Sequence, residues 1–133
     1  MIYGIGVDLV RISRMSRVVE RWGDRFIKRV FTPDEIKTCF KRAFPPSAFA
    51  LRFAAKEAFT KAMGLGITRG MVWRDIEVFN DPGGKPGLKV HGKSARICDE
   101  KSIANIHLSL TDEIEYAIAM VVLEKHDEDR QSS

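Results

Sequence analysis

The chain has 133 residues, of which 44% are hydrophobic and 30% charged, with a formal net charge of +4 at pH 7. This length fits a single domain, and the composition argues against intrinsic disorder. No stretch approaches the roughly 20 apolar residues that a membrane span requires, so a membrane protein is not predicted.

The N-terminus and the cysteines indicate the compartment. Met1 to Asp8 has no basic leader before an apolar run, so it is not predicted to be a signal peptide. Cys39 and Cys98 lie far apart without CxxC spacing, which favours free thiols in a reducing cytosol. We therefore predict a cytoplasmic protein with one domain over residues 1–124 and a polar, flexible tail over residues 125–133.

The first elements are a strand and a helix. Ile2 to Val7 is short, β-branched and punctuated by glycine, which predicts a strand that ends near Asp8. From Ser13 to Trp22, apolar residues recur at helical spacing with arginines on the complementary face, and Gly23 interrupts the pattern.

Two further helices follow. Thr32 to Glu35 predicts a helix start, with threonine as N-cap, proline at the first helical position and glutamate at the third. Pro45 to Ser47 is expected to stop that helix and to cap a longer one, which runs to Met63 and ends at Gly64.

The second half of the chain is dominated by hairpins. We expect a glycine-rich loop over 64–70, and then a hairpin of strands 76–79 and 88–91 around a turn at 80–86. A helix over about 92–101 should follow. The domain should end in a second pair of strands, 105–110 and 116–123, joined by a turn at 111–115, with the last strand buried on both faces. The sheet should then be mostly antiparallel, and the fold class α+β with a long central helix.

The long helix carries the most informative pattern. Glu57 lies one turn before Lys61, so the two share a face, while alanine and phenylalanine supply a packing surface around them. A hard cation prefers a carboxylate, and a phosphate prefers a neighbouring ammonium. The pattern is therefore typical of a metal-and-phosphate site.

Asp8 is a candidate second carboxylate for the same ion. It follows the first strand closely after Gly4 and Gly6, whose missing side chains let another backbone or a ligand come near. Taken alone, Asp8 is interpreted rather as a helix N-cap, and nothing in the spacing proves that it meets Glu57.

Other polar residues suit a multiply phosphorylated ligand. Arg52, Lys56 and Lys61 surround Glu57 in the sequence, and the loop after Gly64 offers backbone N–H groups. His107 lies in an alternating strand; a lone histidine there is more often structural, but near carboxylates it is a candidate base or phosphate ligand.

The N-terminal third is strongly basic. Residues 11–42 contain ten basic and four acidic side chains, a net charge of +6. We expect an acidic partner or an anionic ligand to approach this segment.

Taken together, these motifs resemble the 4′-phosphopantetheinyl transferases, and specifically their short bacterial members, the holo-acyl-carrier-protein synthases. The resemblance covers about residues 1–124. It rests on Gly6-x-Asp8 with Arg14, on Arg52-Phe-Ala-Ala-Lys-Glu-Ala-x-x-Lys-Ala-x-Gly64, on Gly64-x-Gly-Ile, on Asp75-Ile-Glu-Val, on Asn80-Asp81 with Gly84-Lys-Pro86, and on Ser109-Leu-Thr with Tyr116-Ala.

The resemblance implies an Mg²⁺-dependent enzyme of fatty acid biosynthesis. Such an enzyme transfers 4′-phosphopantetheine from coenzyme A to a serine of acyl carrier protein and releases adenosine 3′,5′-bisphosphate. Asp8 and Glu57 would ligate Mg²⁺ on the pyrophosphate, and a base, either His107 or a metal-bound water, would accept the serine proton. The residues implied in coenzyme A binding are Arg52, Lys56, Lys61, Gly64, Gly66, Gly84, Lys85 and Pro86.

The resemblance also implies partners. The family forms homotrimers with active sites between subunits, and its basic helices meet acidic helices of the carrier protein. The residues implied in that contact are Arg14, Met15, Val18, Arg21, Arg25, Phe26 and Arg29.

One position departs from the family pattern, and two other functions compete. Many relatives carry a second histidine where this chain has Asp112, so a role for that histidine is not transferred. A basic nucleic-acid-binding module would explain residues 11–42 but would leave Glu57 and Lys61 unused. A non-catalytic binder of coenzyme A or carrier protein is the other alternative.

Overall fold

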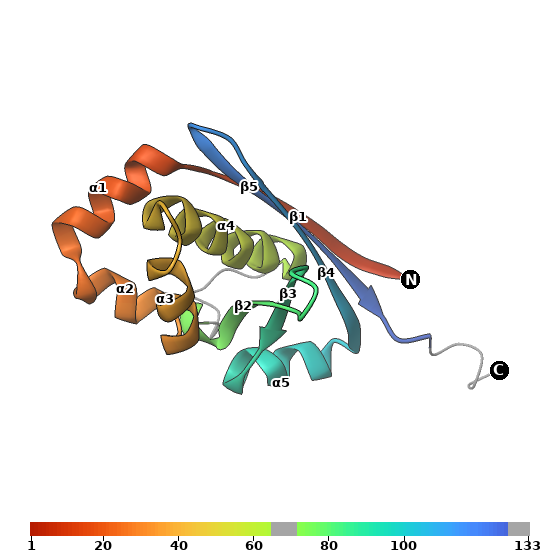
Figure 1. The fold of residues 1–133 in the computed structure, drawn as a ribbon. Helices are drawn as coiled ribbons and strands as arrows, with labels where there is room; N and C mark the ends of the chain where they lie inside the picture. The colour runs from red at the N-terminus through yellow and green to blue at the C-terminus, as the bar shows by residue number, and fades with distance from the viewer. Residues whose placement is uncertain (65–71, 128–133) are drawn as a thin grey trace.

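The computed structural model describes residues 1–64 and 72–127 as a sheet crossed by a long helix, with smaller elements around them (Figure 1). The elements are β1 (Ile2–Arg11), α1 (Ile12–Trp22), α2 (Asp24–Val30), α3 (Pro33–Phe40), α4 (Pro45–Met63), the 3-10 turn η2 (Trp73–Asp75), β2 (Ile76–Asn80), β3 (Pro86–Val90), α5 (Gly92–Glu100), β4 (Ile103–Asp112) and β5 (Tyr116–Lys125). The predicted α+β class is confirmed.

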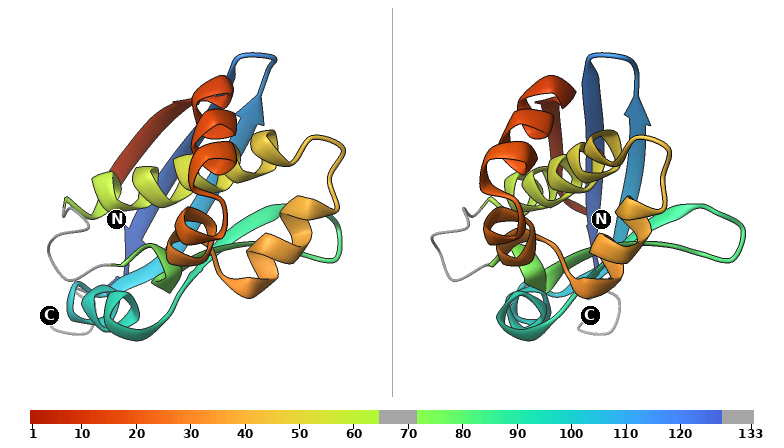
Figure 2. Two further views of the ribbon diagram at one scale, coloured as in Figure 1. Left: turned by 90° about the vertical axis from the view of Figure 1, so that its left-hand side faces the viewer. Right: turned by 60° about the vertical axis from the view of Figure 1, so that its left-hand side comes forward.

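The main sheet is antiparallel in the order β1-β5-β4, and α4 packs across one of its faces. β2 and β3 form a separate antiparallel hairpin, with β3 next to β4. The three short helices α1 to α3 gather beside α4 (Figure 2), on the opposite side of the molecule from the chain termini (Figure 1). In the described parts of the chain, no helix has the length and apolar character needed to cross a bilayer.

Glycines in β1 allow its backbone to lie directly against α4. A Cβ added at Gly4 would lie 2.0 Å from the carbonyl oxygen of Ala62, and one added at Gly6 would lie 1.9 Å from that of Ala58. Both alanines are buried. Since side chains alternate along a strand, Asp8 extends from the same face as these glycines and is brought to the helix.

The opposite face of the sheet is open and apolar. Ala117, Ala119, Val121 and Leu123 of β5 are fully buried against α4, whereas Met120 between them is 43% exposed. The prediction that 116–123 is buried on both faces is therefore wrong for the single chain, because α4 covers only one face. On β1, the side chains that share the open face are 51% to 58% exposed: Ile5, Val7 and Leu9.

A second core lies between α1, α2, α3 and the first half of α4. Its centre is aromatic, with the rings of Phe31 and Phe49 4.8 Å apart. Cys39 is buried in this core and Cys98 in the core under the sheet, both as free thiols. Burial raises the pKa of each thiol to about 11, so neither is a reactive thiolate at neutral pH.

Several element boundaries differ from the prediction. β1 continues through Asp8 to Arg11, because α1 begins only at Ile12, so Asp8 is a strand residue and not an N-cap. A further helix, α2, follows Gly23. β5 runs through Lys125, one residue into the segment predicted as a tail.

The two predicted helix starts had different outcomes. The capping box of Thr32 and Glu35 is confirmed, and Gly64 ends α4 in the left-handed conformation with φ 77°. Ser47 is not a cap, because Pro45 already occupies the first turn of α4 and Phe44 is the N-cap residue. Tandem prolines end one helix, but they also suit the first turn of the next.

The glycine contact generates a test. Gly6→Ala should lower the free energy of unfolding by about 2 to 3 kcal/mol, because the added methyl group meets helix backbone that cannot rotate away. Gly83→Ala is the matched control, since a Cβ there meets only the Asp81 carboxylate at 3.4 Å. Urea unfolding of both variants measures the difference, and equal stabilities would contradict the proposed close packing.

Candidate active site

Asp8 and Glu57 meet at one depression between β1 and α4, and Lys61 lies beside Asp8. The Lys61 ammonium lies 2.9 Å from Asp8 Oδ1 and donates a second hydrogen bond, of 3.1 Å, to the carbonyl oxygen of Val7. Asp8 and Glu57 both line this depression, which has a volume of about 360 Å³. Residues 49 positions apart in the chain thus share one site.

The electrostatics of the depression favour a cation between the carboxylates. The pKa of Glu57 is raised, first by burial and second by the negative charge of Asp8, while Lys61 acts in the opposite direction. Two close carboxylates repel each other, and a divalent cation relieves that repulsion. The described residues contain no cluster of three or more histidine, cysteine or acidic side chains that could hold a metal. Two carboxylates fit Mg²⁺, which takes most of its oxygen ligands from water and phosphate.

The depression continues towards α1 and α2 as an apolar surface with a basic edge. Its other described lining residues are Leu9, Val10, Arg11, Arg14, Met15, Val18, Phe26 and Phe53. The Arg11 guanidinium donates a hydrogen bond of 3.0 Å to the Tyr116 hydroxyl, which orients it at this edge. The carboxylates therefore open onto the basic segment.

Two shallower depressions extend this surface over α1 and α2, and Val18 lines all three. One is lined by Arg14, Arg17, Val18, Glu20, Arg21 and Trp22, the other by Val18, Trp22, Arg25, Phe26 and Arg29. Of the residues predicted to meet a carrier protein, Met15 is buried in the core. The remaining six line these depressions.

Trp22 belongs to the same surface and was not predicted. It is 46% exposed, and the Arg21 guanidinium lies 5.3 Å from the centroid of its ring. In the sequence, Trp22 was only the last position of the predicted helix. The helix ends at Trp22, so the ring projects beyond the core.

A second candidate site surrounds Arg52 on another side of α4. Arg52 is nearly buried; it donates hydrogen bonds to the Ala48 carbonyl oxygen at 3.2 Å and to Asn80 Oδ1 at 3.5 Å. Its buried Nε has no hydrogen-bond partner among the described residues. The cavity here measures about 440 Å³ and is lined by Arg42, Phe44, Ser47, Ala48, Leu51, Arg52, Val78, Asn80, Pro86, Leu110 and Asp112.

This second cavity brings together Arg52 and Pro86 among the predicted coenzyme A contacts. Gly84 and Lys85 lie in the adjoining hairpin turn, where Asn80 Nδ2 donates to the Gly84 carbonyl oxygen at 3.1 Å. Gly66 lies outside the described residues.

The two candidate sites face different directions. Arg52 and Glu57 are five residues apart, which places them about 140° apart around the α4 axis. Moreover, the two depressions share no described lining residue.

Lys56 lies in the protein interior, which the sequence did not indicate. It is fully buried, 2.7 Å from Glu35 Oε1, and it also donates to the carbonyl oxygens of Trp73 and Ile76. The predicted coenzyme A contact therefore does not fit this structure, because the ammonium is enclosed by protein.

His107 does not join the carboxylates within one chain. Asp8 is level with Ala119 and Leu110, whereas His107 pairs with Val122, so the two lie about 10 Å apart across the strands and about 10 Å along them. His107 also extends from the open face of the sheet, where its Nε2 lies 2.6 Å from Glu124 Oε1. A role as base at Asp8 and Glu57 would require a neighbouring subunit.

Comparison with known proteins identifies the family of the chain. Residues 4–121 match the family model of the 4′-phosphopantetheinyl transferase superfamily. The chain belongs to this superfamily. It is 48% identical over 125 residues to a holo-[acyl-carrier-protein] synthase of Geobacter sulfurreducens, covering 94% of this chain and 99% of the relative. A synthase of Syntrophus aciditrophicus is 46% identical, over 93% of this chain and 97% of that protein.

Solved structures of synthases from this superfamily share the fold. The holo-[acyl-carrier-protein] synthase of Neisseria meningitidis is similar with a TM-score of 0.88 and 38% identity, over 94% of this chain and 100% of that one. The synthase of Helicobacter pylori, solved in complex with coenzyme A, has a TM-score of 0.81 and 32% identity, over 90% and 99% of the two chains. The family predicted from the sequence motifs is thus confirmed.

The raised pKa of Glu57 predicts a pH-dependent stability. Because the folded state binds this proton more tightly than the unfolded state, Glu57 makes folding less favourable as pH rises above the ordinary carboxyl pKa of about 4.5. Without metal, Glu57→Gln should therefore melt at a higher temperature than the unsubstituted protein at pH 7.5, and the difference should shrink towards pH 4.5.

The control is Glu100→Gln at the exposed end of α5, which should leave the midpoint unchanged. Calorimetry in EDTA and then in Mg²⁺ makes the comparison. The added metal should stabilise the unsubstituted protein and not Glu57→Gln. A Glu57→Gln variant that is less stable in EDTA at pH 7.5 would contradict the electrostatic interpretation.

Proposed function

We propose that this protein transfers 4′-phosphopantetheine from coenzyme A to a serine of apo acyl carrier protein and releases adenosine 3′,5′-bisphosphate. The observation that carries the proposal is that Asp8, with Lys61 paired to it, meets Glu57 at a depression that opens onto a basic surface. The relatives of this protein that are named holo-[acyl-carrier-protein] synthase also support the proposal, since they are 42% to 48% identical over nearly the whole chain.

Asp8 and Glu57 would hold Mg²⁺ on the diphosphate of coenzyme A. When bound there, the ion neutralises phosphate charge and orients the diphosphate for attack. Lys61 already holds Asp8 in place through a 2.9 Å ion pair and, being more than half exposed, has surface left for a phosphate oxygen. Both effects stabilise negative charge that grows on the leaving phosphate.

In the reaction, the serine oxygen of the carrier protein forms a bond to the phosphorus that bears pantetheine. The bond from that phosphorus to the bridging oxygen breaks, and adenosine 3′,5′-bisphosphate leaves with the electron pair. Asp8 and Glu57 would both be engaged as metal ligands, so the serine proton would pass to another base, for which the candidate from the sequence is His107 of a neighbouring chain.

The carrier protein would dock along α1 and α2. Arg14, Arg21, Arg25 and Arg29 line depressions that continue into the one with the carboxylates, and Val18 and Phe26 supply apolar contact between them. The positive charge of this surface would attract an acidic helix of the carrier protein. Docking there would bring the serine of the carrier protein towards Asp8.

Coenzyme A would bind across two subunits of a homotrimer. The diphosphate belongs at Asp8 and Glu57, and the adenosine end at the cavity around Arg52 and Pro86, yet these sites face different sides of α4. A neighbouring chain packed on the open apolar face of the main sheet would cover Ile5, Val7 and Met120 and supply the second half of the site. We expect this assembly to act in the cytoplasm.

Mass spectrometry of apo acyl carrier protein incubated with the protein, coenzyme A and Mg²⁺ tests the transfer. The carrier protein should gain one phosphopantetheine, and Glu57→Gln should abolish that gain while preserving the fold. Binding of coenzyme A without transfer would favour a non-catalytic binder.

In the same assay Arg14→Glu should raise the KM for carrier protein, with the larger effect at low salt, because a surface charge is then less screened.

The oligomeric state tests the assembly. By light scattering, the protein should have three times the chain mass, and Ile5→Asp, which places a charge on the open sheet face, should reduce it to that of a single chain. Ile114→Asp is the control, because Ile114 is 93% exposed in the turn between β4 and β5, outside the sheet face. A single-chain mass for the unsubstituted protein would reject the trimer.

A further inference from the structure

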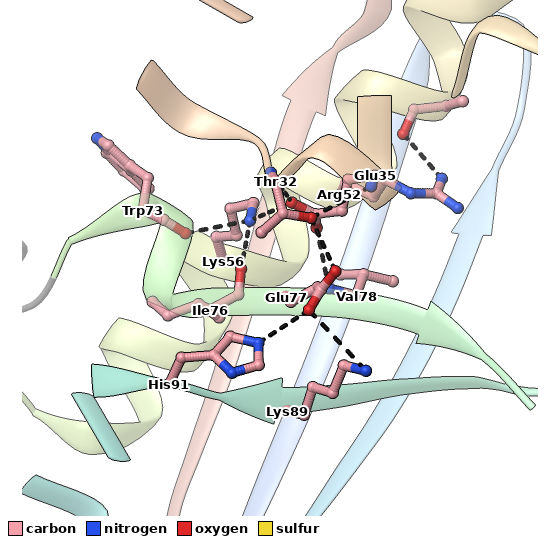
Figure 3. Close-up of polar contacts among 11 residues, drawn as sticks. Thr32, Glu35, Arg52, Lys56, Trp73, Ile76, Glu77, Val78, Lys89 and His91 are labelled. Atoms are coloured by element: carbon pink, nitrogen blue, oxygen red, sulfur yellow. Dashed lines mark hydrogen bonds and ion pairs between the residues drawn. The ribbon is translucent and has the colours of Figure 1, made fainter. Parts of the chain in front are cut away.

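A buried network of charges connects α3, α4 and β2 behind the Arg52 cavity (Figure 3). At its centre the Lys56 ammonium contacts the Glu35 carboxylate, the Trp73 carbonyl oxygen and the Ile76 carbonyl oxygen. An ammonium has three N–H donors, so these acceptors satisfy it. Lys56 thus ties the middle of α4 to the chain that enters β2.

Glu35 completes the connection from the other side. Both its side chain and that of Lys56 are fully excluded from solvent. Glu35 Oε1 accepts the Thr32 N–H at 2.9 Å as part of the capping box of α3, and Oε2 accepts the Val78 N–H at 2.9 Å. One carboxylate therefore bonds to α3, to α4 through Lys56, and to the backbone of β2.

A second layer extends the network to the surface. The Thr32 hydroxyl donates to Glu77 Oε2 at 2.8 Å, and Glu77 Oε1 lies 2.8 Å from His91 Nε2 and 4.0 Å from the Lys89 ammonium. Burial acts to raise the pKa of Glu77, but the hydrogen bonds from His91 and Thr32 outweigh it and the pKa is lowered. Glu77 is thereby held ionised, and it connects β2 to β3.

The network adjoins the Arg52 cavity. Arg52 lies one helical turn before Lys56 on α4, and Val78, which bonds to Glu35, lines the same cavity. Across that cavity, Arg52 meets Asn80 of β2 only through a long hydrogen bond of 3.5 Å. The hydrogen bonds of Lys56 and Glu35 between α4 and β2 are shorter than this Arg52 contact and are shielded from solvent.

We propose that Lys56 and Glu35 are positioning residues for coenzyme A: their ion pair holds α4 and β2 at the separation in which Arg52 and Asn80 receive the phosphorylated adenosine end. This inference rests on the proposed function. Neither residue touches the ligand, and both act through Arg52 and β2.

A purely stabilising role is a weaker explanation of the pair. Burying two charges costs desolvation energy that their attraction often only balances, so apolar or neutral residues of similar size can replace such a pair without loss of stability. Two charges with several geometrically fixed hydrogen bonds do, however, specify one relative placement of the elements that they join.

The test compares coenzyme A with dephospho-coenzyme A, which lacks the 3′-phosphate. The double variant Lys56→Met with Glu35→Gln removes both charges and leaves no unpaired ion. We expect calorimetry to show that this variant binds coenzyme A roughly tenfold more weakly, because Arg52 and Asn80 would be displaced from their places at the ligand. The kcat at saturating coenzyme A should change less than about twofold. Dephospho-coenzyme A should lose less affinity than coenzyme A.

Controls separate this role from general loss of stability. Cys98→Ala removes a buried group on α5, away from both sites, and should lower the melting temperature without changing either affinity. Lys56→Gln with Glu35→Gln also leaves no unpaired ion, keeps a donor for the carbonyl oxygens of Trp73 and Ile76, and serves if the first double variant does not fold; it should weaken coenzyme A binding in the same direction.

The outcomes are distinguishable. A folded variant with the same coenzyme A affinity as the unsubstituted protein overturns the inference, as does an equal loss for both ligands. If the unsubstituted protein binds no coenzyme A at all, the proposed function itself fails.

Discussion

The backbone of β1 lies against the backbone of α4, and this contact determines where the groups of the candidate active site lie. Glycine at positions 4 and 6 makes the approach sterically feasible, since any larger residue would overlap with helix carbonyl groups. Two residues later on the same face, Asp8 then lies beside the helix surface that carries Glu57 and Lys61. The carboxylates are therefore placed by rigid elements and not by a loop, as a precise metal and phosphate site requires.

α4 separates its charges by environment. Lys56 and Lys61 are only five residues apart, yet the first is sealed within a network of carboxylate and carbonyl oxygens and the second lies at the surface beside Asp8. Burial lowers the pKa of Lys56, and the Glu35 carboxylate opposes this shift. One lysine thus organises the protein interior, and the other remains free to meet an anionic ligand. Arg52 is on the same face of α4 as Lys56, and its guanidinium provides positive charge at the second cavity.

The sequence indicated the residues that meet at the candidate active site better than it indicated their surroundings. Glu57 and Lys61 were recognisable because helical spacing places them on one face, and the capping residues Thr32 and Glu35 have a strict local pattern. The approach of Asp8 was not predictable from spacing alone, because it depends on a contact between β1 and α4 that forms only in the fold. The burial of Lys56 was missed for a similar reason: its partner Glu35 was interpreted as a helix cap, which it is, and its second set of contacts involves distant residues. The open face of β5 was missed because an apolar run does not reveal how many layers will cover it.

The uncovered side of the main sheet also has a consequence for cells that make this protein. A single copy presents a row of aliphatic side chains to its surroundings, and in the proposed trimer other copies would cover them. Where a site needs groups from two copies, the total catalytic rate rises more steeply than in proportion to the protein concentration. Dilution lowers the number of chains and also dissociates the assemblies that contain complete sites. In the proposed trimer, the amount of protein that a cell makes would therefore influence the activity per chain, without any effector molecule.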